Sequence, residues 1–279
     1  MVNSNGTLVE ANEIVGTGNR GFLFGDAVFE TIRIRDGKVL FLEDHYFRLM
    51  ATMRIVRMEI PMNFTMEYIE SQILMTASAN LCERAARIRV TVFRNDGGFY
   101  LPETNTIGYV IHAISLEKED YSIQSLFYEV DLYKDFHIAK HLLSTLKTTN
   151  KMIHITGSIF AKENELQNCL LLNEEKNVVE ALHGNIFMLM GKTLITPPIS
   201  DGCLNGVMRK NIIAIAKELG DIEVIEKSIS PFDLQKADEL FITNVIQGIQ
   251  SITKYRKKEY QTTQANILVQ KLNTIIAGA

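Results

Sequence analysis

Residues 27–56, AVFETIRIRDGKVLFLEDHYFRLMATMRIV, contain the pattern that decides the fold of the first part of the chain. Two extended apolar stretches flank Asp36-Gly37, and an Asp-Gly pair in that position is the strongest short signal for a β-hairpin. The next apolar residues recur at three- and four-residue steps and predict a helix that ends before Pro61; they are Leu42, Tyr46, Leu49, Met53 and Val56. We expect this apolar stripe to face a sheet.

The same sheet is predicted to continue downstream. Ile88, Val90 and Val92 alternate with polar residues, and residues 106–116 form another apolar run, so both stretches are expected to be strands. A short charged stretch follows. We therefore predict two domains, residues 1–116 and residues 123–279, joined by a linker at residues 117–122.

The second part begins with short apolar runs broken by turns, at residues 168–172, 178–181, 186–190 and 193–196. This spacing predicts a meander of strands. A helical stripe then runs from Met208 to Leu219, after Asn205-Gly206 and before Gly220, a residue suited to a left-handed helix end. A last helix is expected at residues 264–276, and sheet and helix together predict an α+β fold.

Composition narrows the functional classes. The 279 residues are 46% hydrophobic and 22% charged, and the net charge of −4 comes from acids and bases mixed along the chain. Without a basic stripe, nucleic acid and anionic membrane are poor candidate partners, and no apolar run approaches the length of a membrane span. Cys82, Cys169 and Cys203 are far apart, so we expect buried free thiols and a cytoplasmic protein that binds a small molecule.

Common catalytic motifs are missing from the sequence. There is no Walker loop, dinucleotide-binding glycine fingerprint, G-x-S-x-G elbow or H-E-x-x-H pair. The six histidines have no ligand-like pairing with nearby acids, so a metal site is not expected and each histidine is interpreted as satisfied or exposed.

Several short segments in a fixed order carry more information. They are Phe24-Gly25-Asp26-Ala27-Val28-Phe29-Glu30 with His45-x-x-Arg48-Leu49, then Leu146-Lys147-x-x-Asn150, then Glu180-x-x-x-Gly184-Asn185-Ile186-Phe187, then Thr196-Pro197-Pro198 with Gly202-x-Leu-x-Gly206-Val207-Met208-Arg209, and finally Asp238-Glu239-x-Phe241-x-Thr243-Asn244. In this order the chain resembles the class IV enzymes that use pyridoxal 5'-phosphate (PLP). That group contains branched-chain aminotransferase, D-amino-acid aminotransferase and aminodeoxychorismate lyase.

The resemblance implies a two-domain fold type IV enzyme with the cofactor at the domain interface. Lys147 would carry the cofactor and later move the proton of the substrate α-carbon as general base and acid. Glu180 would face the pyridine nitrogen and keep it protonated, so that the ring accepts electron density. Arg48 would bind the phosphate, a role that suits its planar guanidinium.

The remaining cofactor contacts are expected in the C-terminal domain. Gly206, Val207 and Met208 start a helix, where free backbone amides and the positive end of the helix dipole favour phosphate. Thr243 and Asn244 can add donors, and Asn185 belongs to the same set by resemblance.

Arg33, Arg94 and Asn244 are the candidates for holding a substrate carboxylate, because a carboxylate in a partly dry pocket needs a paired cation. Phe29 is a further candidate for contact with the substrate. Phe29 stands at a position where D-amino-acid aminotransferases carry a tyrosine. Met152 stands at a position where branched-chain aminotransferases carry a tyrosine. Lys147-x-x-Asn150 looks closest to the lyases, yet Phe99 replaces an arginine that the lyases carry.

The first expectation for function is amino-group transfer between a small amino acid, branched-chain or D-type, and a 2-oxo acid. Aminodeoxychorismate lyase activity, which releases pyruvate and 4-aminobenzoate, is the alternative, and a non-catalytic protein of the same fold is a second one. The family resemblance also implies a homodimer.

Overall fold

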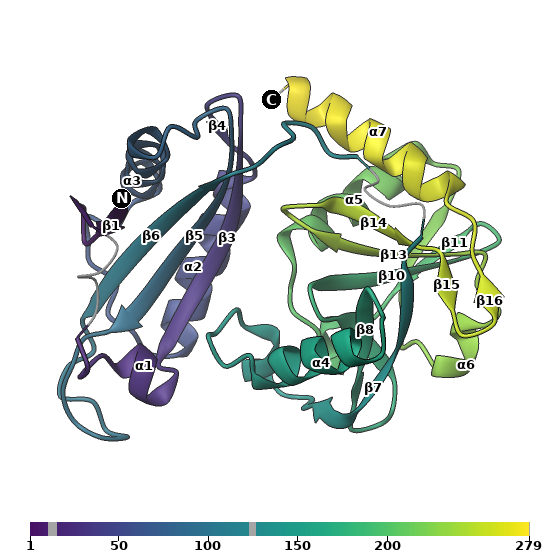
Figure 1. Cartoon of the computed structure of the whole chain (residues 1–279), viewed down its shortest axis with the longest axis horizontal. Helices are drawn as coiled ribbons and strands as arrows, with labels where there is room; N and C mark the ends of the chain where they lie inside the picture. Colours follow the sequence, from purple (N-terminus) through teal and green to yellow (C-terminus); the bar gives the residue numbers. More distant parts are fainter. Residues whose placement is uncertain (11–15, 123–126, 279) are drawn as a thin grey trace. The chain divides into compact units, whose positions relative to one another are not determined.

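The computed structural model describes residues 1–10, 16–122 and 127–278. These form two compact units, Met1–Asp120 with Lys147–Asn150, and Tyr121–Leu146 with Lys151–Ala279 (Figure 1). The sequence interpretation placed Lys147 in the C-terminal domain, whereas this division groups Lys147–Asn150 with the first unit. The predicted boundaries stay a prediction, and residues 123–126 of the expected C-terminal domain lie outside the described residues.

The first unit is built on an antiparallel sheet with the order β2-β1-β6-β5-β3-β4. Its elements are β1 (Val2–Ser4), β2 (Thr7–Val9), α1 (Arg20–Phe24), β3 (Ala27–Arg35), β4 (Lys38–Val39), α2 (Leu42–Ile55), α3 (Met66–Ala79), β5 (Ala85–Arg94) and β6 (Ile107–Ser115). The predicted hairpin is confirmed: Asp36 (φ 50°) and Gly37 (φ 77°) both adopt the left-handed conformation between β3 and β4.

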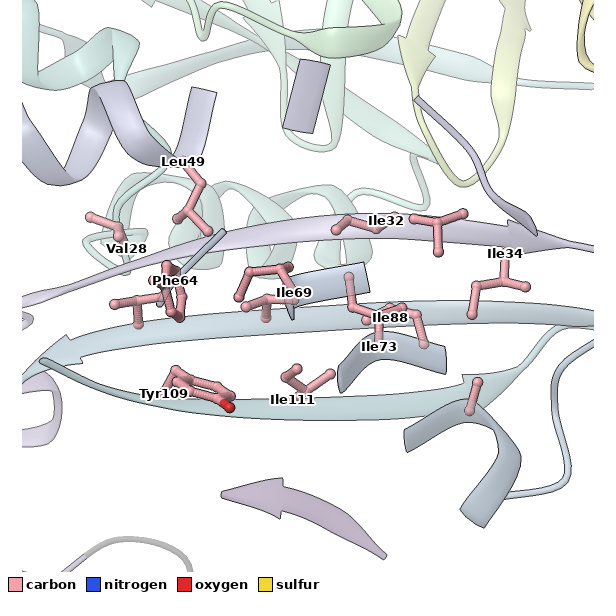
Figure 2. Packing of buried hydrophobic residues seen from close by; sticks show 14 of the residues in the cluster. Val28, Ile32, Ile34, Leu49, Phe64, Ile69, Ile73, Ile88, Tyr109 and Ile111 are labelled. Atoms are coloured by element: carbon pink, nitrogen blue, oxygen red, sulfur yellow. The ribbon is translucent and has the colours of Figure 1, made fainter. Parts of the chain in front are cut away.

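Helices α2 and α3 cover one face of this sheet (Figure 1). Figure 2 shows how Leu49 of α2 and Ile69 and Ile73 of α3 pack against Ile32 of β3 and Ile88 of β5. Each fully buried side chain of this kind contributes about 1.5–3 kcal/mol. The predicted apolar stripe on residues 42–56 therefore faces the sheet as expected.

The second unit contains a sheet with the order β12-β11-β10-β9-β8-β7-β15-β16, in which β13 also pairs with β10 and with β14. Its strands are β7 (Glu129–Ile138), β8 (Asn168–Asn173), β9 (Val178–Ala181), β10 (Gly184–Met190), β11 (Thr193–Thr196), β12 (Glu223–Glu226), β13 (Glu239–Asn244), β14 (Gly248–Ile252), β15 (Lys254–Tyr255) and β16 (Lys258–Glu259). Strands β8 to β11 pair in sequence order and antiparallel, which confirms the predicted meander.

The helices of the second unit are η1 (Leu142–Thr145), α4 (Met152–Glu163), η2 (Ile199–Asp201), α5 (Val207–Leu219), α6 (Pro231–Leu234) and α7 (Thr263–Gly278). Helix α4 packs on β7 and β8, and α7 packs on α5 and β14. Gly220 ends α5 at φ 75°, as predicted. The α+β class is thus confirmed, and so are the three free, buried cysteines.

Among the described residues no helix is long and apolar enough to cross a membrane.

Candidate active site

Lys147 lies beside the first long strand of the first unit. Its carbonyl accepts a hydrogen bond from the Phe29 N–H (2.9 Å), and the Thr149 N–H donates to the carbonyl of Ala27 (3.0 Å). These bonds fix Lys147–Asn150 as an extended segment along the start of β3. The Lys147 amine lies 4.6 Å from the centroid of the Phe29 ring. The hydrogen bonds thus fix the backbone of Lys147, and its amine lies beside the Phe29 ring.

A buried carboxylate pairs with Arg48, the residue predicted to bind phosphate. Arg48 donates from Nε to Oε1 of Glu30 (2.7 Å) and from Nη2 to Oε2 (2.5 Å), while His45 Nδ1 lies 2.8 Å from Oε2. Burial alone would raise the pKa of the Glu30 carboxyl, but the Arg48 charge and the bonds from both partners lower it to about 2. Glu30 is therefore ionised, and it orients Arg48 through two hydrogen bonds. The phosphate role of Arg48 stays a prediction.

His45 hydrogen-bonds to Glu30 and lies within the electrostatic influence of Arg48 and Lys147. Burial lowers the pKa of its imidazole, Glu30 opposes that shift, and the charges of Arg48 and Lys147 lower the pKa further. The imidazole is neutral at pH 7, and Nδ1 carries the hydrogen because an ionised Glu30 can only accept. His45 Nε2 is buried and has no partner among the described residues.

A second cation lies over the Phe29 ring. The Arg89 guanidinium carbon is 3.8 Å from the ring centroid, and its Nε donates to Thr91 Oγ1 (3.2 Å). Phe29 pairs with Thr91, and Thr31 with Arg89, across β3 and β5, so these side chains share the sheet face turned away from α2 and α3. Within the described part of the chain no carboxylate pairs with Arg89. It is thus placed to meet an anionic ligand close to Lys147.

The two arginines predicted from the sequence as substrate groups make other contacts. Arg33 Nη2 donates to the carbonyls of Lys118 (2.5 Å) and Glu119 (3.0 Å). Arg94 donates from Nε to Asp26 (2.9 Å) and from Nη1 to the Asn105 side chain (2.6 Å). Both guanidinium groups are buried and hold loops of the first unit, and a substrate role for either stays a prediction.

Glu180, the candidate partner of a pyridine nitrogen, lies on β9 in the second unit and is 5% exposed. His154 Nε2 lies 3.1 Å from its Oε1, and the Leu204 N–H donates to its Oε2 (2.9 Å). Burial would raise the pKa of the Glu180 carboxyl, but these hydrogen bonds and the charges of His154 and Lys151 outweigh burial and lower the pKa. The carboxylate is ionised and can accept from a protonated ring nitrogen.

The start of α5 offers donors to an anion. Gly206 is the N-cap residue of this helix and makes no side-chain capping bond. The backbone N–H groups of Val207 and Met208, in the first turn, therefore have no acceptor within the helix, and they lie at the positive end of its dipole. Asn185 Nδ2 donates to the carbonyl of Leu204 (2.8 Å) and fixes the approach to the helix. A Cβ on residue 206 would lie 2.0 Å from Asn185 Oδ1, which explains the glycine.

Thr243 and Asn244 end β13, next to this helix start. Thr243 pairs with Asn185 across β10 and β13, and its buried hydroxyl has no partner among the described residues. Asn244 Oδ1 accepts from the N–H groups of Ile246 (3.0 Å) and Gln247 (2.9 Å), so that its side chain shapes the turn. An unpaired buried hydroxyl beside a helix N-terminus is the arrangement expected of a phosphate cradle.

The comparisons with known proteins decide the family. The profile described as amino-transferase class IV matches residues 27–255. The chain belongs to this family. The family predicted from the sequence, and with it the expectation of an enzyme, is confirmed.

Relatives within the class IV family differ in their named activities. The chain is similar to a putative branched-chain-amino-acid aminotransferase of Methanocaldococcus jannaschii, at 29% identity over 96% of this chain and 92% of the relative. It is also similar to the aminodeoxychorismate lyase of Bacillus subtilis, at 25% identity over 96% and 93%. The crystal structure of the Thermoproteus uzoniensis branched-chain aminotransferase with norvaline matches at TM-score 0.85 and 25% identity, over 99% of this chain and 97% of that one.

Sequence reasoning missed Arg89, Glu30 and His154 as residues of the candidate site. The alternation of Arg87, Arg89 and Thr91 placed them on a polar sheet face, and the face alone did not indicate a ligand. The signal for Glu30 was present in the spacing His45-x-x-Arg48, which puts both side chains on one side of a helix.

Proposed function

We propose that this class IV enzyme uses PLP to move an amino group between a small amino acid, branched-chain or D-type, and a 2-oxo acid. The observation that carries the proposal is the position of the Lys147 amine, 4.6 Å from the Phe29 ring centroid, with the Arg89 guanidinium over the same ring. A lysine amine and a cation for the substrate carboxylate are the two groups that an amino acid must meet at once.

The residues present fit the cofactor. The Thr243 hydroxyl, which has no partner among the residues that the structure describes, and the first amides of α5, from Val207 and Met208, suit its phosphate, and the ionised Glu180 suits its ring nitrogen. When bound, PLP supplies a ring that accepts electron density from the substrate α-carbon. We assign Arg48 to the phosphate as well, where Glu30 holds its guanidinium in one orientation.

The protein groups then have separate tasks. Lys147 takes the proton from the substrate α-carbon and returns it at another atom, which requires its amine to be neutral at that moment. Arg89 holds the substrate carboxylate and lies on the same ring as the lysine. Phe29 excludes water from the side of the amine that faces the sheet.

The test is the visible absorption spectrum of the purified protein, recorded while L- and D-amino acids are added one at a time. Absorption lost with one amino acid, together with release of the matching 2-oxo acid, is the expected result. Arg89→Gln should raise the KM for that amino acid about tenfold or more, since a charge-assisted hydrogen bond contributes about 1.5–3 kcal/mol. Arg87→Gln, on an exposed arginine of the same strand, is the matched control.

Aminodeoxychorismate lyase activity is the second candidate, because the match to the Bacillus subtilis lyase covers 96% of this chain. Pyruvate released from aminodeoxychorismate, with no spectral response to any amino acid, would replace the first proposal by this one. A protein that never takes up PLP would contradict both.

We further propose a cytoplasmic homodimer, as the family resemblance implies. Sedimentation of the cofactor-saturated protein should give twice the chain mass, and a monomer at all concentrations would contradict the dimer.

A further inference from the structure

His154 is a half-buried histidine to which the reaction described above assigns no task. It lies on α4, and its side chain is 19% exposed. Its Nε2 lies 3.1 Å from Oε1 of Glu180, the carboxylate assigned to the ring nitrogen. The sequence offered no sign of this contact, because His154 and Glu180 are 26 residues apart and on different elements.

The geometry fixes where the hydrogen lies. Glu180 is ionised and can only accept, so His154 Nε2 must be the donor of the 3.1 Å contact. The other ring nitrogen, Nδ1, is buried without a partner among the described residues. A buried unpaired nitrogen costs about 1–3 kcal/mol, so the histidine is a poor choice for packing alone. An apolar side chain of similar volume would fill the same space without that cost.

Glu180 keeps room for a ligand. A carboxylate has about four lone-pair positions, and the two contacts from His154 and Leu204 occupy one on each oxygen. The other groups that face Glu180 are the Lys151 cation and the Cys203 thiol. Burial raises the pKa of that thiol to about 12, so it stays neutral. His154 is therefore a side chain that acts on Glu180 by direct hydrogen bonding.

We propose that His154 is a positioning residue that keeps a proton on the ring nitrogen of the bound cofactor, by donating its Nε2–H to Glu180. The inference rests on the proposed function. One proton is shared between the Glu180 carboxylate and the ring nitrogen, and a donor on the carboxylate makes the carboxylate less basic. The proton then stays on the nitrogen. Without the donor it moves toward Glu180, and the ring accepts electron density less readily.

The test compares His154→Phe, which keeps a planar ring without a donor, with His154→Gln, which keeps an N–H donor of similar reach. The full-length protein is loaded with cofactor labelled with ¹⁵N in the ring, and the protonation of that nitrogen is followed by NMR against pH. We expect the ring nitrogen of His154→Phe to lose its proton at least one pH unit below the wild-type midpoint, a tenfold change in proton affinity. His154→Gln should remain close to wild type.

A second measurement tests the same role if His154→Phe does not fold. The affinity of the cofactor-free protein for pyridoxamine phosphate is compared with that for an analogue with carbon in place of the ring nitrogen. The wild type and His154→Gln should prefer the nitrogen ring by about tenfold more than His154→Asn, whose shorter amide does not reach Glu180.

Equal titration midpoints in wild type and His154→Phe, or equal preferences in the second measurement, would overturn the role of His154 and leave the proposed function intact. A wild-type protein that binds neither cofactor form would instead overturn the proposed function, and the inference with it.

Discussion

Replacing Gly206 with alanine should act through a single neighbouring side chain. Gly206 has φ −74° and ψ 136°, a backbone that alanine adopts without strain. The new Cβ would lie 2.0 Å from Asn185 Oδ1, whereas its contact with the Arg209 Cβ, at 3.4 Å, is an ordinary one. Asn185 must therefore turn away, and it then loses its 2.8 Å hydrogen bond to the carbonyl of Leu204.

The size of the effect follows from that bond. Asn185 is 3% exposed, and a buried amide left without its partner costs about 1–3 kcal/mol. Alanine is also a poorer N-cap than glycine, by about 0.5–1 kcal/mol, but it lowers the entropy of the unfolded chain by a similar amount. Gly206→Ala should thus destabilise the protein by about 1–3 kcal/mol. In an Asn185→Ala background, where nothing clashes, it should cost less than about 0.5 kcal/mol.

Urea unfolding of the wild type, the two single variants and the double variant measures this coupling without any cofactor. Gly220→Ala provides the control: its positive φ of 75° makes it destabilising, yet a Cβ there meets open space, so its cost should add to that of Asn185→Ala. A double variant at positions 185 and 206 that shows the full sum of the two single effects would refute the steric argument.

Three further predictions test other parts of the candidate site. Lys147→Ala should abolish both the visible absorption of bound cofactor and turnover, while Lys162→Ala, at an exposed lysine of α4, should leave both unchanged. Thr243→Val should weaken cofactor binding about tenfold, with little change in unfolding free energy, because it removes a hydroxyl that has no partner in the described part of the chain. Ser251→Ala removes another buried hydroxyl of the same kind and should not change cofactor affinity. Glu30 has a folded pKa of about 2, below its unfolded value, so it contributes stability that is present above about pH 5 and lost as the pH falls toward 2. The unfolding free energy of Glu30→Gln should fall less than that of wild type over this window, and parallel curves would contradict the assignment.

Local patterns determined much of the fold. The Asp36-Gly37 turn, helix α2, the meander of β8 to β11 and helix α5 were all predicted, because each depends on residues close in sequence. The parallel pairs β11 with β12 and β7 with β8 could not be predicted, since they join strands that are separated by other elements. Helix α4 was also missed, although it carries His154.

The candidate site divides in the same way. Lys147, Glu180 and Gly206 were predicted as site residues from the short motifs that surround them in the sequence. Arg94 was a reasonable carboxylate partner by charge, but its Nε reaches Asp26, 68 residues away, and no local pattern announces that contact. Arg89 became a candidate only when the register of β3 and β5 placed it over the Phe29 ring. Contacts between residues far apart in sequence thus decide which of several arginines is placed to bind a ligand.

The two buried carboxylates show why only one of them suits a ring nitrogen. Both Glu30 and Glu180 are ionised and accept a hydrogen bond from a histidine. Glu30 is also bound at both oxygens by the Arg48 cation, which neutralises its charge, whereas the second donor to Glu180 is the neutral backbone N–H of Leu204. A buried negative charge is costly unless it is paired, and a protonated ring nitrogen would add a cation to the Glu180 carboxylate. Glu180 is therefore the carboxylate that gains most from a cationic ligand, while Glu30 is suited to orienting Arg48.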